Sequence, residues 1–264
     1  LAGFQQRWLR PDNLKIYVVS DRPLAEVQAQ LERRFGQWAP PQAERGTKAF
    51  PPLPARRDSP RIIFIDRPQS PTSVIIGAEL TPVDPRSDIT ALTSANGVVG
   101  GNFLSRINMD LRETKGWSYG VSGVVQINEK AVPYVVSAPV QANRTGDSIN
   151  ALIRNYRDFL GARGTTDEEL KRIIAKSIQE LPGRFETSDA VLSAMQSNDL
   201  LGRPDDYYEL LAAKYRGQTR AGVDAAFRSA VALDGLTWIV VGDAKVVMPQ
   251  LKRLGMPIEV AQPN

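Results

Sequence analysis

The chain has 264 residues, of which 42% are apolar and 23% charged, a composition typical of a globular protein with one or two domains. Its net charge of +4 is spread along the chain, so no Lys/Arg-rich tract indicates a nucleic-acid partner or an anionic membrane. The sequence contains no histidine and no cysteine, which excludes His- or thiolate-ligated metals, disulfides, and His- or Cys-based catalytic triads. Acid–base chemistry would have to come from carboxylates, lysine, tyrosine or another chain.

Apolar stretches and the first residues give expectations about location. No stretch reaches the roughly 18–20 apolar residues that a membrane helix needs, so we expect a soluble chain without a membrane span. Cytoplasm and periplasm both remain open, because the lack of cysteine fits either. The chain begins at Leu1 and shows no signal-peptide pattern, so we expect a processed product or a fragment.

Two segments near the ends of the chain carry the same pattern, displaced by 222 residues. Residues 12–21 and 234–243 each begin and end with Asp, and both contain a Leu and a Val pair at matching positions. Helical patterns precede and follow both copies. We interpret this as a duplicated helix–strand–helix unit, although two buried strands bounded by turn residues can also look alike by chance.

The duplication predicts an uneven division of the chain. Residues 1–38 are expected to be the C-terminal tail of a preceding homologous domain, with a strand inside residues 12–21. Residues 39–60 contain six prolines and are typical of a semi-rigid linker. Residues 61–264 are expected to form one complete copy of the domain.

In residues 61–264, most predicted strands lie before residue 142 and most predicted helices lie after it. Strands are expected at 61–66, 72–80, 117–126, 131–141 and 236–241. One helix carries Phe103, Ile107 and Leu111 on one face and ends near Gly116. Other helices are expected at 88–99, 145–160, 166–182, 187–201, 205–215, 219–231 and after residue 243. This order predicts an α+β fold, with a largely antiparallel sheet covered by helices.

Two short motifs are better explained by structure than by binding. The glycines of residues 97–101 match no phosphate-binding spacing, and predict a tight turn between helices with a positive φ at glycine. Thr166 and Glu169 have the spacing of a capping box, so the acids beside them are expected to stabilise a helix start rather than bind a cation.

A longer motif over residues 100–120 is different in kind. A glycine pair, Ser-Arg-Ile, Leu-Arg-Glu, Lys-Gly and Trp-Ser-Tyr-Gly follow one another in this order. The order resembles the pitrilysin/insulinase family of zinc metallopeptidases, as do the Pro-rich linker and the Val-Val-Gly-Asp ending of residues 240–243. The resemblance covers essentially the whole chain and implies a duplicated, pitrilysin-type domain.

The resemblance also implies which half of such an enzyme this is. The family's zinc site, a His-x-x-Glu-His helix with a further Glu, cannot exist in a chain without histidine, and residues 88–95 offer no ligand set in its place. The chain is therefore expected to be an inactive peptidase domain, with no cofactor of its own and no activity alone. Its expected partners are a homologous zinc-bearing subunit or domain and a peptide substrate.

In the family pattern an arginine and a tyrosine of the non-zinc half contact the substrate carbonyl and the transition state. The matching positions here are Arg112 and Tyr119, on a helix end and the start of the following strand. A guanidinium and a phenol can stabilise the oxyanion that forms when water attacks a peptide carbonyl. A surface Arg112 with a packed Tyr119 is the structural alternative.

Other functions stay open at this stage. The chain could be a scaffold subunit that keeps the fold without catalysis, or part of a self-contained protease whose preceding domain carries the zinc motif. The sequence does not indicate which peptides are bound. It also leaves open whether the partner is a second copy of this chain or a different one.

Overall fold

The computed structural model describes residues 1–262, which form two compact units. One unit joins Leu1–Pro52 with Glu180–Asp205, and the other joins Leu53–Gln179 with the residues from Asp206 onward. No helix within residues 1–262 is long and apolar enough to cross a membrane.

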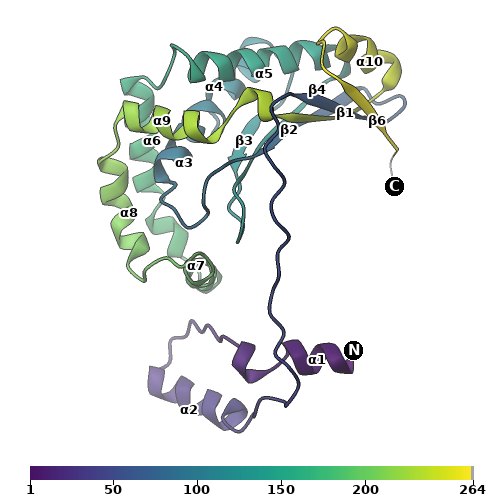
Figure 1. Cartoon of the computed structure of the whole chain (residues 1–264). Coiled ribbons are helices and arrows are strands. Elements are labelled where there is room, and N and C mark those ends of the chain that lie inside the picture. The colour runs from purple at the N-terminus through teal and green to yellow at the C-terminus, as the bar shows by residue number, and fades with distance from the viewer. Residues whose placement is uncertain (263–264) are drawn as a thin grey trace. The chain divides into compact units, whose positions relative to one another are not determined.

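The larger unit is built on a six-stranded sheet (Figure 1). Its order is β3-β4-β2-β5-β1-β6. Strand β1 pairs in parallel with β5 and β6, and the remaining pairs, β2–β4, β2–β5 and β3–β4, are antiparallel. The predicted α+β class with a largely antiparallel sheet is thus confirmed. The strands are β1 (Arg61–Asp66), β2 (Thr72–Leu80), β3 (Ser122–Val125), β4 (Pro133–Gln141), β5 (Thr237–Gly242) and β6 (Ile258–Ala261).

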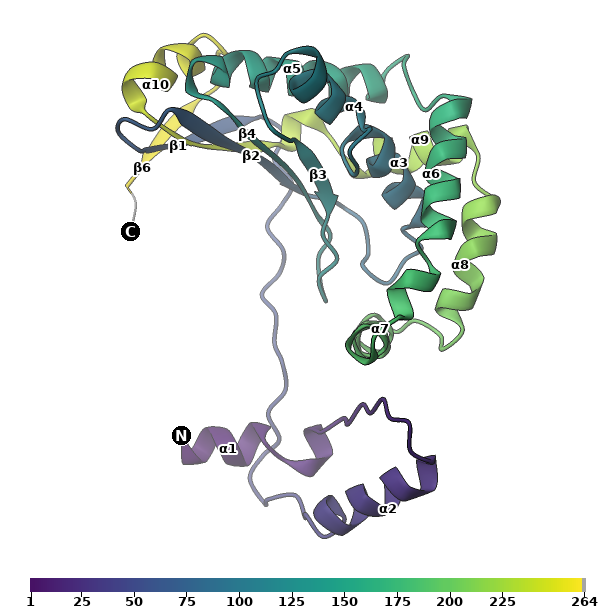
Figure 2. The same ribbon diagram turned by 180° about the vertical axis from the view of Figure 1, so that it is seen from behind.

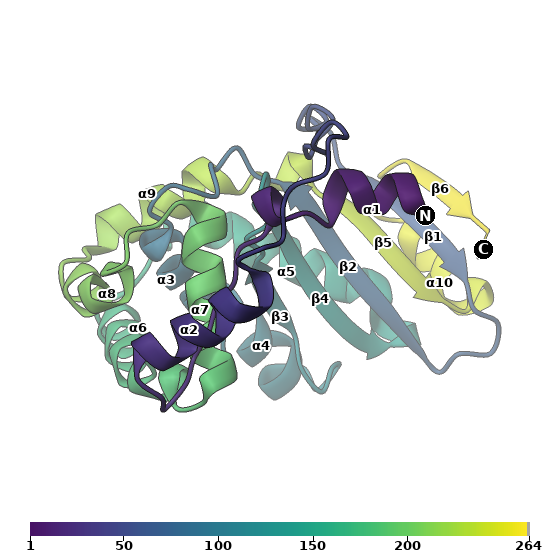
Figure 3. The ribbon, with the colours of Figure 1, turned by 90° about the horizontal axis from the view of Figure 1, so that it is seen from below.

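Helices α5 (Thr145–Leu160) and α10 (Ala244–Lys252) lie across one face of this sheet (Figures 1 and 2). Figure 3 shows β1, β2, β4 and β5 from the opposite side, in front of the two helices. The remaining helices of the unit are α3 (Thr90–Val99), α4 (Arg106–Asn108), the π-helix η2 (Met109–Thr114), η3 (Ala142–Arg144), α6 (Asp167–Gln179), α8 (Tyr207–Arg216), α9 (Arg220–Ala230) and η5 (Leu233–Gly235).

Strand side chains alternate between a buried and a half-exposed environment, as expected for a sheet covered on one face. In β5, Trp238 and Val240 are 0% exposed, whereas Ile239 between them is half-buried. On the covered face, the rings of Tyr134 and Phe227 pack edge-to-face with centroids 5.5 Å apart. Such a pair contributes roughly 0.5–1.5 kcal/mol beyond the burial of its area.

Local signals for helix ends are largely confirmed. The capping box forms in both directions: the Glu169 N–H donates to Thr166 Oγ1 at 3.2 Å, and the Thr166 N–H donates to Glu169 Oε2 at 2.9 Å. A turn does follow α3, but Gly100 there has φ −150°, so the expected positive φ is wrong. Glycine is needed for closeness instead, because a Cβ at Gly100 would lie 2.8 Å from the Gly123 nitrogen.

Two predicted elements of the larger unit differ clearly from the structure, and one observed strand has no predicted counterpart. The strand expected at residues 117–126 shrinks to β3, and Ser118 makes only an isolated bridge with Val140 of β4. Phe103 lies before the helix that was expected to contain it and is 55% exposed, while Ile107 and Leu111 are both buried. Strand β6 was not predicted.

The smaller unit contains α1 (Ala2–Trp8), η1 (Pro11–Asn13), α2 (Leu24–Phe35), η4 (Pro182–Phe185) and α7 (Ser188–Leu201). The strand predicted inside residues 12–21 is not formed: residues 14–20 have no paired strand within residues 1–262. A strand needs a neighbour to satisfy its backbone groups. Lys15 and Tyr17 contact α7 instead, where the Tyr17 hydroxyl donates to Asp199 Oδ2 at 2.5 Å and Lys15 forms an ion pair with the same carboxylate.

Candidate functional site

Arg112 lies in the π-helix η2, which continues directly from α4. The N–H of Lys115 donates to the carbonyl of Asp110, five residues back, at 3.0 Å. Turns of this kind are rare and occur frequently at functional sites. The guanidinium carbon of Arg112 lies 4.5 Å from the centroid of the Phe103 ring, within the range of a cation–π contact.

The Arg112 side chain is 38% exposed, and its Nε lies 3.2 Å from Oε1 of the neighbouring Glu113. Within residues 1–262 no other group accepts a hydrogen bond from this guanidinium. Stacking uses the face of the guanidinium, so the Nη edge remains able to donate to a ligand. Arg112 is thus contacted by Phe103 and Glu113, and its side chain is still partly exposed.

Tyr119 lies on the loop between η2 and β3 and is 96% exposed. The backbone on both sides of it is anchored. Ser118 Oγ donates to a carbonyl of β4 at 2.5 Å and accepts from the Gly120 N–H at 3.1 Å. The Val121 N–H donates to Asn108 Oδ1 at 2.9 Å. Tyr119 therefore projects into solvent from a fixed backbone, and the loop replaces the strand that was expected to start at Trp117.

Trp117 connects the helix end to this loop, and two cations contact its ring. Lys115 Nζ and the guanidinium carbon of Arg144 are each 5.5 Å from the Trp117 ring. Lys115 also pairs with Asp110, and Arg144 lies 3.2 Å from Asp147. Each cation is thus already paired with an acid, so this cluster supports the loop rather than forming an anion site.

Arg112 and Tyr119 share one stretch of chain but do not bond to each other among the residues described. The sequence analysis named both residues as site candidates. It missed Phe103 and Asn108, which contact the Arg112 guanidinium and the loop beyond Tyr119. Both lie within the motif of residues 100–120, but neither belongs to the motif residues that the sequence analysis singled out.

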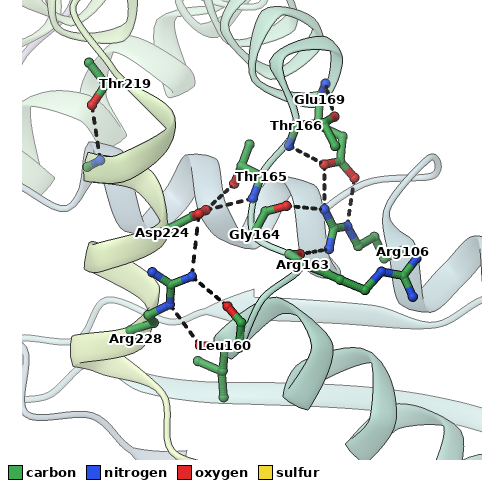
Figure 4. A network of polar contacts seen from close by, with 12 residues as sticks. Arg106, Leu160, Arg163, Gly164, Thr165, Thr166, Glu169, Thr219, Asp224 and Arg228 are labelled. Atoms are coloured by element: carbon green, nitrogen blue, oxygen red, sulfur yellow. Dashed lines mark hydrogen bonds and ion pairs between the residues drawn. The ribbon is translucent and has the colours of Figure 1, made fainter.

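A depression of about 1210 Å³ is lined by residues of α4, η2, α5, α6 and α9, many of them charged. Figure 4 shows that several of these residues bind one another in a network of polar contacts. Arg106 binds Glu169 through two hydrogen bonds of 2.8 and 2.7 Å and also donates to the carbonyl of Gly164. Asp224 accepts from the N–H and the hydroxyl of Thr165. These bonds fasten the loop between α5 and α6.

Metal binding has no candidate in the described part of the chain. Within residues 1–262, no group of three or more His, Cys, Asp or Glu side chains is placed to hold an ion. The residues described here therefore do not match the zinc ligands of a metallopeptidase.

A family model described as the peptidase M16 inactive domain matches residues 1–177. The chain belongs to this family. The match includes η2 and the Tyr119 loop, and it confirms the resemblance to the zinc metallopeptidases that the motif of residues 100–120 suggested. A search of curated proteins found no match.

Solved structures show the same fold at low sequence identity. An M16 inactive domain from Pseudomonas fluorescens is 18% identical with a TM-score of 0.73, and covers 84% of this chain and 52% of its own. A protease from Helicobacter pylori is 14% identical with a TM-score of 0.75, over 90% and 57%. The first half of the periplasmic protease PqqL from Escherichia coli is 16% identical with a TM-score of 0.73, over 94% and 55%. The chain spans about half the length of these structures.

Proposed function

We propose that this chain is the non-zinc half of an M16 metallopeptidase and supplies Arg112 and Tyr119 to a site completed by a homologous zinc-bearing half. The family match makes the domain one of the inactive type. The observation that carries the proposal is the exposure of Tyr119, which reaches 96% on a backbone anchored at both sides. A large aromatic side chain left in solvent by a rigid loop favours a binding role over packing.

The chemistry expected of this half is electrostatic. A peptide carbonyl that is attacked by water gains negative charge on its oxygen, and donors that are already in place stabilise that charge at little reorganisation cost. The Tyr119 hydroxyl and the Nη edge of Arg112 are such donors. No group of three or more His, Cys, Asp or Glu side chains within residues 1–262 is placed to hold a metal. The proposal therefore assigns activation of the water to the partner half.

The test is reconstitution with the zinc-bearing half, identified by its His-x-x-Glu-His motif. Cleavage of a fluorogenic peptide is measured for this chain, for the partner and for the mixture. We expect this chain alone to be inactive and the mixture to exceed the partner alone. If the mixture assembles but the partner's rate never changes, the complementing role is wrong and the scaffold function is favoured.

We further propose that residues 1–38 are the end of a preceding homologous domain, with 39–60 as linker and 61–264 as the complete copy. The alternating apolar side chains of the extended residues 14–20 support this assignment. Leu14, Ile16 and Val18 are each more than 40% exposed. Displaced by 222 residues, they correspond to Leu236, Trp238 and Val240, all 0% exposed in β5 and the residue before it.

The segment thus has the inward-facing pattern of β5 without a sheet to cover. Adjacent valines provide a matched test in a longer protein that includes this preceding domain. Val18→Asp would place a charge where Val240 is buried, whereas Val19→Asp corresponds to Val241, which is half-buried. We expect loss of assembly by size-exclusion chromatography for the first variant only. Equal behaviour of the two variants would contradict the assignment.

A further inference from the structure

Asn108 is a buried amide, 4% exposed, at the junction of α4 and η2. Its Nδ2 donates to the carbonyl of Phe103 at 2.7 Å, and its Oδ1 accepts from the N–H of Val121 at 2.9 Å. The two partners fix the orientation of the amide, because a carbonyl only accepts and a backbone N–H only donates. One side chain therefore joins the backbone before Arg112 to the backbone after Tyr119.

The first of these bonds acts on Arg112 through Phe103. The Phe103 ring is 55% exposed and packs against the Arg112 guanidinium, with the guanidinium carbon 4.5 Å from the ring centroid. A free arginine side chain samples many rotamers, and stacking on a fixed ring reduces that number before any ligand arrives. The Phe103 carbonyl is in turn fixed by Asn108.

The second bond acts on Tyr119. Val121 lies two residues beyond Tyr119, and its N–H bonds to Asn108 rather than to a neighbouring strand. Ser118 anchors the other side of the loop. The direction in which Tyr119 leaves the surface therefore depends on Asn108 at one end and on Ser118 at the other.

We propose that Asn108 is a positioning residue that sets Arg112, through Phe103, and Tyr119, through Val121, in a fixed relation to each other. Its importance for turnover rests on the proposed function. Its hold on the two segments is a property of this chain alone, and can be measured without the partner.

Two substitutions separate the two bonds. Asn108→Asp keeps an oxygen that can accept from Val121 and loses the donor to Phe103, whereas Asn108→Ala loses both. Phe103→Leu removes the ring face but keeps apolar bulk, and Phe103→Tyr restores the ring. The control is Asn96→Asp: Asn96 is 7% exposed and likewise donates to a backbone carbonyl, that of Gly123, at 2.8 Å.

The first measurement is made by NMR on this chain. We expect the Arg112 Nε–H proton to carry a ring-current shift that persists in Phe103→Tyr, disappears in Phe103→Leu and decreases in Asn108→Asp. Hydrogen exchange of the Val121 amide should accelerate in Asn108→Ala and stay near the wild-type rate in Asn108→Asp. An unchanged Arg112 resonance in Asn108→Asp would overturn the proposal, even if Asn108→Ala failed to fold.

The second measurement is turnover in the reconstituted enzyme. A displaced binding group costs up to about 10²-fold, so we expect Asn108→Asp to lower kcat by about 10–10². Phe103→Leu in the same chain should then add little, because both changes act through Arg112. Asn96→Asp should leave kcat near wild type, and a loss as large as that of Asn108→Asp would contradict a positioning role.

The two proposals can fail separately. If Arg112→Lys and Tyr119→Phe both leave the rate unchanged, the proposed function is wrong. The Arg112 resonance and the Val121 exchange rate then still decide whether Asn108 holds these segments.

Discussion

Replacing Tyr119 by phenylalanine separates a catalytic role from a structural one, because it removes one hydroxyl and keeps the ring. If that hydroxyl donates to the developing oxyanion, its loss should lower kcat by about 10²–10³, which corresponds to roughly 3–4 kcal/mol. The measurement is cleavage of a fluorogenic peptide by the reconstituted enzyme under saturating substrate.

The effect on stability should be close to zero. Tyr119 is 96% exposed and its hydroxyl has no hydrogen-bond partner within residues 1–262, so folding neither buries the ring nor satisfies the hydroxyl. At about 25 cal/mol per Å² of apolar area buried, a ring that buries almost no area contributes almost nothing. Even Tyr119→Ala should therefore melt close to the wild-type temperature, unlike a variant of a packed tyrosine.

Tyr208→Phe on α8 is the control, since it makes the same chemical change in a half-buried tyrosine outside the site. Arg112→Lys tests the neighbouring donor, because an ammonium cannot reproduce two-point recognition by a planar guanidinium. Full turnover by Tyr119→Phe, with the partner bound and the melting temperature unchanged, would refute the reasoning.

Two further predictions concern stability. Burial tends to raise the pKa of Glu169, but its hydrogen bonds with Arg106 and Thr166 outweigh this and lower the pKa below its ordinary value of 4.5. The depressed pKa means that the charged form stabilises the fold above pH 4.5, and that this stabilisation is lost as the pH falls through the lower folded-state value. Glu169→Gln should thus cost about 1–3 kcal/mol in urea titrations at neutral pH, and progressively less below pH 4.5. The control Glu168→Gln changes an exposed carboxylate and should cost little at neutral pH. Gly116→Ala and Gly202→Ala should each cost roughly 1–2 kcal/mol, since both glycines have φ +63° and open space at the Cβ position. Only Gly116→Ala should also lower turnover, because Gly116 leads into the Tyr119 loop; equal turnover in the two variants would count against a role for that loop.

Elements with local signals could be predicted from the sequence. Strand β2 and helix α5 have the predicted bounds, and the capping box of α6 forms with the predicted partners. Alternation, helix periodicity and capping depend on neighbouring residues, which a sequence displays directly. Strand β6 has only four residues and exists because it pairs with the edge of β1, a contact that no local pattern reveals.

The extended residues 14–20 show the opposite case. Their pattern matches β5 closely enough to predict a strand, but a strand requires backbone partners, and residues 1–262 provide none for this segment. The apolar side chains of Leu14, Ile16 and Val18 stay exposed for the same reason. Sequence pattern gives the preference of a segment, and the neighbouring strands decide whether that preference is met.

At the candidate site, the spacing of Phe103, Ile107 and Leu111 predicted that all three lie on one face of a helix. Local hydrogen bonds explain why Phe103 does not. Asn102 donates to the carbonyl of Gly97 and accepts from the N–H of Leu104 at 2.9 Å, an Asx turn that competes with helix formation. The helix therefore begins only at Arg106, and Phe103 remains outside it, 55% exposed. Leaving a phenylalanine in water forfeits the gain from burying it, so the ring requires another reason to be there. The Arg112 guanidinium lies against the face of this ring and gives the ring a role outside the core. The residue that does not follow the helical spacing is therefore the one that contacts the arginine of the family motif.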